Sequence, residues 1–130
     1  MQDFNDSDDI TKNYVDEILK WLPLSQDILV RVEAIKLIIP SAARYEQMAE
    51  ECTELAQALL KMARKLRKEN FTPKTYYEIK KSIIEEWTDV NICALTLDLE
   101  TDSVVMIKKM DRWIERNSSS LSEETNNETD

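Results

Sequence analysis

The chain has 130 residues, of which 42% are hydrophobic and 33% are charged, and its formal net charge is −9. This balance is typical of a single globular helical domain. The sequence contains neither glycine nor histidine. It therefore excludes glycine-rich phosphate loops, dinucleotide-binding fingerprints, histidine-dependent triads and histidine-ligated metals. Any catalytic chemistry must come from carboxylates, Lys, Arg, Tyr and the two cysteines.

Apolar periodicity predicts two helices in the first third of the chain. The first begins at Asp8 or Asp9 and reaches residue 21, because Pro23 stops it. The second covers about residues 26–39 and ends before Pro40.

Ser41 is expected to cap a long third helix that reaches about residue 69. Its predicted core row repeats at helical spacing and comprises Met48, Cys52, Leu55, Leu59, Met62 and Leu66. Thr72 and Pro73 then predict a cap and a first-turn proline for a fourth helix, which reaches about residue 99. Its predicted core row comprises Ile79, Ile83, Trp87, Val90, Ala94 and Leu97.

A last helix is predicted from residues 101–103 to about residue 116, and no segment alternates as a strand does. The predicted fold class is all-α, a bundle of four to five helices built around a long antiparallel helical hairpin and completed by oligomerisation. Residues 1–117 form the predicted single domain. Residues 118–130 contain four acidic residues, no basic residue and one large apolar residue, so we expect a disordered acidic tail.

Charge and hydropathy bear on compartment and partners. The longest run without charge, residues 90–97, is far shorter than the roughly 18–20 apolar residues that cross a bilayer. The acidic N-terminus lacks the order of a signal peptide. We therefore expect a cytoplasmic protein with no membrane partner. In that reducing compartment Cys52 and Cys93 would be free thiols, and Cys52 would be buried as a small hydrophobic side chain.

The excess of acidic residues argues against stable nucleic-acid binding, which depends on Lys and Arg at phosphates. One local cluster departs from this balance, namely Lys61, Arg64, Lys65, Arg67 and Lys68. We interpret this cluster as a solvated helix end, where cations interact favourably with the helix dipole.

Two acidic pairs stand out on the two longest predicted helices. Glu51 and Glu54 are three residues apart, as are Glu86 and Asp89, so each pair projects from one helix face beside a core row. If the helices pack antiparallel, four carboxylates converge, and like charges this close require a cation. Oxygen ligands favour a hard divalent ion, Mg²⁺ or Mn²⁺. Either pair alone would more simply be a solvated face, but their paired placement favours a metal site.

These residues resemble the signature of the MazG-like branch of the all-α nucleoside triphosphate pyrophosphohydrolases. That signature is EExxE followed by ExxD on the next helix, with the first motif here at Glu50, Glu51 and Glu54 and the second at Glu86 and Asp89. The later stretch IKKMDRWIERN resembles the basic last helix of the family. The resemblance covers about residues 45–117. Segment 55–85, which separates the two motifs, is longer than the spacing of compact members, and this predicts a longer hairpin.

The resemblance implies Mg²⁺-dependent cleavage of a nucleoside triphosphate between its α- and β-phosphates, giving a monophosphate and pyrophosphate, in nucleotide-pool house-cleaning. It implies metal ligation by Glu51, Glu54, Glu86 and Asp89. Glu50 or Glu51 would accept a proton from the attacking water, and the sequence leaves this choice open. The family builds its sites across subunits, so we expect a homodimer or homotetramer.

The remaining expected site residues would contact the substrate. Lys108 and Arg112, four residues apart on the last helix, would grip the triphosphate, and Arg116 extends their stripe. Lys61 would contact phosphate or neutralise the carboxylates, and Gln47 is a further substrate-binding candidate. Base recognition would fall to aromatic or amide groups of the N-terminal helices. Tyr14 and Trp21 are candidates for it, although a core position is the more common role of such side chains.

Two other functions compete with this prediction. A related enzyme could act on phosphoribosyl-ATP, dUTP or dCTP. A catalytically silent helical interaction module is the alternative from another class, but it would leave the acidic pairs together with Lys108 and Arg112 unexplained.

Overall fold

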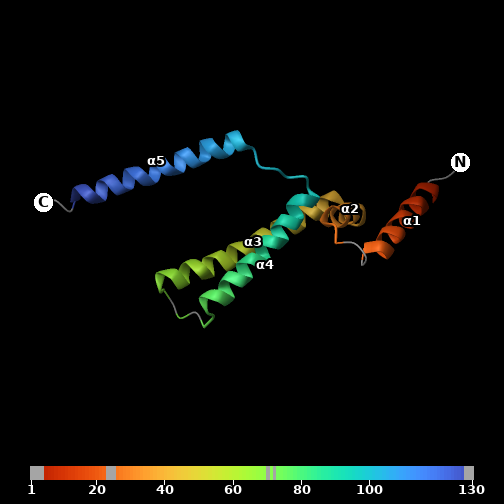
Figure 1. The fold of residues 1–130 in the computed structure, drawn as a ribbon, viewed down its shortest axis with the longest axis horizontal. Helices are drawn as coiled ribbons and strands as arrows, with labels where there is room; N and C mark the ends of the chain where they lie inside the picture. Colours follow the sequence, from red (N-terminus) through yellow and green to blue (C-terminus); the bar gives the residue numbers. More distant parts are fainter. Residues whose placement is uncertain (1–4, 23–25, 70, 72, 128–130) are drawn as a thin grey trace. The chain divides into compact units, whose positions relative to one another are not determined.

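The computed structural model describes residues 5–22, 26–69, 71 and 73–127, which form five helices and no strand (Figure 1). The all-α prediction is therefore confirmed. No helix among these residues is long and apolar enough to cross a membrane. The helices are α1 (Asn5–Trp21), α2 (Ile28–Ile38), α3 (Ser41–Arg67), α4 (Tyr76–Thr96) and α5 (Ser103–Asn127).

The chain divides into two compact units, Met1–Leu99 and Glu100–Asp130. Helices α1 to α4 belong to the first unit and α5 to the second, and each unit is described by itself. The predicted single domain, residues 1–117, spans the boundary between the units and stays a prediction.

Helices α1 and α2 are in contact around the connection between them. Asp27 caps α2, since its carboxylate accepts a hydrogen bond from the Leu29 amide at 2.8 Å. The Arg31 guanidinium donates to the Leu22 carbonyl at 2.9 Å and to the Asp27 carbonyl at 3.1 Å. Helix α2 thus begins two residues later than predicted, because the capping Asp27 lies outside the helix. Helix α1 begins at Asn5, before the predicted Asp8 or Asp9.

The start of α3 corrects one capping prediction. Pro40 occupies the N-cap position with φ −56°, and no side chain caps the helix. Ser41 is already the first helical residue, because the extended backbone of Pro40 leads directly into the first turn. The side chain of Arg44 donates two hydrogen bonds near this helix start. It donates to the Ile39 carbonyl at 3.1 Å and also to the Thr96 carbonyl, which ties α3 to the end of α4.

Helices α3 and α4 lie side by side and form the most extensive interface of the first unit (Figure 1). Ile79 is only 1% exposed. Burial of such a side chain contributes about 1.5–3 kcal/mol. The other buried residues along this interface are Ala58, Met62, Val90, Cys93 and Thr96.

The predicted core rows are confirmed in part. The predicted positions Met62, Ile79 and Val90 are buried. A further group of predicted core residues is half-buried, namely Met48, Leu55, Ile83, Ala94 and Leu97. Cys52, Leu59 and Leu66 are exposed, and Trp87 is 56% exposed. Ala58 and Cys93, which lie beside the predicted rows, are buried as well. The expected burial of Cys52 is therefore wrong, whereas both cysteines are free.

The turn between α3 and α4 is held at both ends by hydrogen bonds. Lys68 adopts the left-handed conformation, with φ 57°. Its amide donates to the Lys65 carbonyl at 3.2 Å, and the Glu69 amide donates to the Arg64 carbonyl at 3.2 Å. These two bonds form the Schellman arrangement. A sequence without glycine must place another residue at this position.

Helix α4 begins with a capping box rather than at the predicted Thr72 and Pro73. The Thr75 hydroxyl accepts from the Glu78 amide at 3.2 Å, and the Glu78 carboxylate accepts from the Thr75 amide at 2.7 Å. This reciprocal pair satisfies two amides that the first turn leaves free. Pro73 lies before this cap, and Thr72 lies outside the described residues. The hydrogen bonds to Thr75 lower the pKa of Glu78.

At its other end, α4 stops at Thr96, three residues before the predicted end. Asp98 follows with φ 53°, and its carboxylate accepts a hydrogen bond from Lys36 at 2.7 Å. Lys36 also lies 3.4 Å from Glu33. These contacts join α2 to the end of α4.

Helix α5 begins after Asp102, whose carboxylate accepts from the amides of Val104 at 2.9 Å and Val105 at 3.0 Å. It continues to Asn127, so residues 118–127 are helical rather than irregular as predicted. Extension of a helix costs little once the preceding turns have formed, which explains why a polar segment continues it. Residues 128–130 of the predicted tail lie outside the described residues.

Candidate metal centre

Three of the four predicted metal ligands meet where α3 and α4 face each other. Glu51, Glu54 and Glu86 each offer a carboxylate oxygen, and these oxygens lie within 4.8 Å of one another. Glu51 and Glu86 are half-buried, whereas Glu54 is exposed. The predicted convergence of the two acidic stripes is therefore confirmed for three of the four positions. We call these three residues the carboxylate triad.

The triad is electrostatically strained without a cation. Partial burial raises the pKa of Glu86, and the charge of Glu54 and a hydrogen bond between the two carboxyl groups raise it further. The charges of Asp89 and Glu51 act in the same direction. A cation bound at this position would compensate the same like charges that raise the pKa of Glu86.

Asp89, the fourth predicted ligand, is exposed and is not among the three oxygens that meet. It is near enough that its charge raises the pKa values of Glu86 and Cys93. The charge of Asp89 thus acts on the triad, but its carboxylate is not one of the three that meet.

The two candidate bases differ in their surroundings. Glu51 belongs to the triad and accepts a hydrogen bond from the Gln47 side-chain amide at 2.5 Å, one turn earlier on α3. Glu50 is exposed and lies outside the triad. Gln47 therefore positions one oxygen of Glu51, and its contact with substrate stays a prediction.

Cys93 lies on the same side of α4, one turn beyond Asp89. Burial raises the pKa of its thiol, and the charges of Glu51, Asp89 and Cys52 raise it further. Among the described residues, the ligand atoms that converge are those of the three glutamates, so this donor set consists of carboxylate oxygens.

Such a donor set suits a hard divalent cation. Oxygen ligands about 2.1 Å from a shared Mg²⁺ lie at most about 4.2 Å apart. The limit of 4.8 Å found for the three oxygens is close to that value. Three carboxylates also leave part of an octahedral shell open to water or phosphate oxygens. The residues present therefore fit Mg²⁺ or Mn²⁺.

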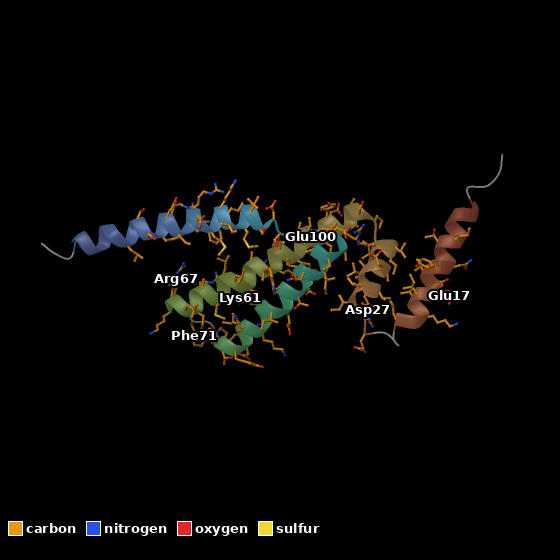
Figure 2. All side chains as sticks on the ribbon, turned by 45° about the horizontal axis from the view of Figure 1, so that its top comes forward. Glu17, Asp27, Lys61, Arg67, Phe71 and Glu100 are labelled. Atoms are coloured by element: carbon orange, nitrogen blue, oxygen red, sulfur yellow. The ribbon has the colours of Figure 1, made fainter. Side chains whose placement is uncertain are left out.

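A pocket of about 310 Å³ opens beside two members of the triad, Glu54 and Glu86. Lys61 on α3, which is labelled in Figure 2, and Lys74 before α4 line it too, so the pocket has both carboxylates and cations in its lining. Ile79 lies in its apolar wall. The remaining lining residues are Gln57, Ala58 and Ser82. This combination of metal-type ligands, cations and neutral hydrogen-bonding groups is suited to a metal-associated phosphate.

Other predicted substrate contacts belong to the second unit. Lys108 and Arg112 are exposed on α5, and their contact with substrate stays a prediction. Arg112 lines a pocket of about 430 Å³ with its helix neighbours Lys109, Trp113, Glu115 and Arg116. Tyr14 on α1 is exposed rather than part of a core, and the side chain of Trp21 lies outside the described residues.

Sequence reasoning missed Lys74, Gln57 and Ser82 as pocket residues. Ser82 lies four residues before Glu86 on the same helix face, so its spacing could have predicted its place in the pocket. No sequence pattern predicted Lys74, because it lies outside both helices that form the pocket.

Comparison of the chain with protein-family models, with curated proteins and with solved structures gave no match.

Proposed function

We propose that this protein is a Mg²⁺-dependent nucleoside triphosphate pyrophosphohydrolase, which releases pyrophosphate and a nucleoside monophosphate. The observation that carries the proposal is the meeting of Glu51, Glu54 and Glu86 from two helices, with their oxygens within 4.8 Å. The resemblance of these positions to the MazG-like signature supplies the reaction class. Nucleotide-pool house-cleaning in the cytoplasm is the role we assign to it.

In this proposal the carboxylate triad holds Mg²⁺, or alternatively Mn²⁺, and Asp89 adds negative charge beside it. A bound Mg²⁺ would neutralise charge on the triad and on the substrate phosphates. Glu51, fixed by Gln47, and Glu50 on the preceding position are the two candidates that accept the proton of the attacking water. Glu51 is better placed to ligate the metal, which favours Glu50 as the proton acceptor.

The cations of the pocket have a defined role in this reaction. Lys61 and Lys74 line the space next to Glu54 and Glu86, where they would hold the phosphates that leave as pyrophosphate. Phosphoryl transfer depends mainly on positioning and charge stabilisation, so no histidine or serine nucleophile is required. Lys108 and Arg112 of α5 are the second proposed phosphate contact, in line with the resemblance of their helix to the basic helix of the family.

We further propose that the chain acts as a homodimer or homotetramer around an antiparallel hairpin of α3 and α4. The exposed row on these helices, including Leu59, Leu66 and Trp87, supports this assembly. The apolar residues of α5 are exposed as well, among them Val104 and Ile114. Helices with uncovered apolar faces are stabilised when a second copy covers them.

The direct test is pyrophosphate release from a panel of ribo- and deoxyribonucleoside triphosphates, with Mg²⁺ and with EDTA. We expect metal-dependent release that Glu54→Gln abolishes. Glu46→Gln, an exposed acidic position on α3 outside the triad, is the matched control and should retain activity. Release from phosphoribosyl-ATP, dUTP or dCTP alone would assign the narrower relative. No release from any nucleotide would favour the silent interaction module.

A further inference from the structure

The charge of this protein is strongly segregated. Residues 64–81, which join α3 to α4, contain seven of the 17 basic residues but only two of the 26 acidic residues. This segment therefore carries a charge of +5, whereas the rest of the chain carries −14. We call this segment the basic tip. Arg67 and Phe71 mark its position at one end of the α3–α4 pair (Figure 2).

Exposed aromatic side chains accompany these cations. Phe71 is 93% exposed and Tyr77 is 74% exposed, and Tyr76 is exposed as well. Aromatic side chains usually dominate the burial of cores and interfaces, so three of them in solvent beside a cationic cluster indicate a contact surface. The Schellman arrangement ends α3 and the capping box begins α4 on either side of Phe71.

A solvated helix end explains only part of this pattern. Arg64, Arg67 and Lys68 lie at the C-terminus of α3, where the helix dipole favours cations. Lys80 and Lys81 lie near the N-terminus of α4, where the dipole provides no such stabilisation. The helix dipole therefore does not account for the cations on the α4 side of the tip.

We propose that the basic tip binds single-stranded nucleic acid. Lys and Arg would contact the phosphates, while Phe71 and Tyr77 would stack on unpaired bases. The cations extend over about 5–8 Å along each of the two helices. A flexible strand can follow them, whereas a flat lipid surface would meet the turn alone. That turn offers a single large apolar side chain, Phe71, which is little for insertion into a bilayer.

The overall acidity of the chain does not extend to this surface. The net charge of −9 is the sum of a basic tip and a strongly acidic remainder. The remainder repels polyanions, so contact is restricted to the tip and to a few nucleotides. Binding is therefore expected to be weak, strongly dependent on salt, and selective for single strands over duplexes. The proposal does not depend on the pyrophosphohydrolase activity.

The test is fluorescence anisotropy with a labelled oligothymidylate of about twelve nucleotides, a length within the range that small single-strand-binding folds cover. EDTA is present, so that metal-dependent contacts at the triad do not contribute. Phe71→Ala/Tyr77→Ala should weaken binding about tenfold through lost stacking. Arg67→Gln/Lys81→Gln should weaken it and reduce the slope of log K against log salt by about 1.4. Lys12→Gln/Lys109→Gln, which removes the same charge elsewhere, should bind as the wild type does.

Circular dichroism verifies that each variant is folded, and Phe71→Ala, in the exposed turn, provides a second variant with minimal effect on packing. Pyrophosphate release should be unchanged in the tip variants, so failure of the enzymatic proposal and failure of this one are distinguishable. Absence of binding by the wild type, or equal binding by tip and control variants, would overturn the proposal. Cosedimentation with phosphatidylserine-rich vesicles without any anisotropy change would overturn it too, and would assign the tip to lipid.

Discussion

Replacement of Glu51 by Gln should stabilise the metal-free protein and destabilise it, relative to the wild type, when Mg²⁺ is present. The substitution keeps the shape of the side chain and an oxygen that accepts the hydrogen bond from Gln47. It removes one negative charge from the triad. The two effects have opposite signs because like charges repel without a cation and ligate a cation together.

The magnitudes follow from the geometry. Two carboxylate oxygens of the triad lie within 4.8 Å of each other. Unit charges at that separation repel by about 0.9 kcal/mol in water, so loss of the repulsion between Glu51 and Glu54 raises the free energy of unfolding by about that amount before screening by salt. The corresponding rise in Tm is about 2–5 °C. Mg²⁺ at about 100 times its Kd stabilises the wild type by about 2.7 kcal/mol, and a variant with roughly tenfold weaker affinity gains about 1.4 kcal/mol at the same concentration.

Thermal unfolding in EDTA and in Mg²⁺ measures both effects. The variant should melt above the wild type in EDTA and below it in Mg²⁺, so that the order of the two Tm values reverses. Glu46→Gln, which lies outside the triad, should follow the wild type in both buffers. The reasoning would be refuted by an equal Mg²⁺-induced rise in Tm for the wild type and for Glu51→Gln.

The remaining predictions test the other parts of the structure. In metal-free buffer, lowering the pH from neutral toward 4.5, the ordinary pKa of a glutamate, should raise the free energy of unfolding. The reason is that the pKa of Glu86 is raised in the folded state, so the folded protein takes up this proton at a higher pH than the unfolded chain does. Thermal melts across that range should lose this gain in Glu86→Gln. Thr75→Ala removes the capping box of α4. It should lower the free energy of unfolding in urea titrations by about 0.5 to about 2 kcal/mol, and an unchanged value would mean that the cap contributes nothing. Lys108→Ala/Arg112→Ala should reduce turnover at least about tenfold with little change in Tm, because both side chains are exposed. Full activity of this double variant would leave the two residues as surface charges. Light scattering should detect two or four chains per particle, since helical faces of this kind assemble symmetrically. A species of 15.2 kDa alone would contradict the proposed assembly.

Several features could be predicted from the sequence because they depend on local interactions. Helical periodicity and Pro40 located α2 and α3 to within about two residues, since turns and helix ends are set by neighbouring residues. The spacing of Glu51 and Glu54 placed both carboxylates near one face of α3 for the same reason. The predicted start of α4 was less accurate. Thr72 and Thr75 are both possible N-cap residues, and only the backbone geometry shows that Thr75 is the cap.

Only the tertiary structure decided which positions of each helix are fully buried. That choice depends on the volumes of side chains from both helices. Val90 is buried as predicted, and Ala58 is buried although it was not predicted, while Trp87 remained 56% exposed. Helix packing brought Glu86 to the α3 carboxylates, as predicted, and left Asp89 outside the triad. The raised pKa of Glu86 arises from burial and from charges on another helix, which no local pattern contains. Thus the sequence identified the acidic residues that could form a site, and helix packing determined which of them meet.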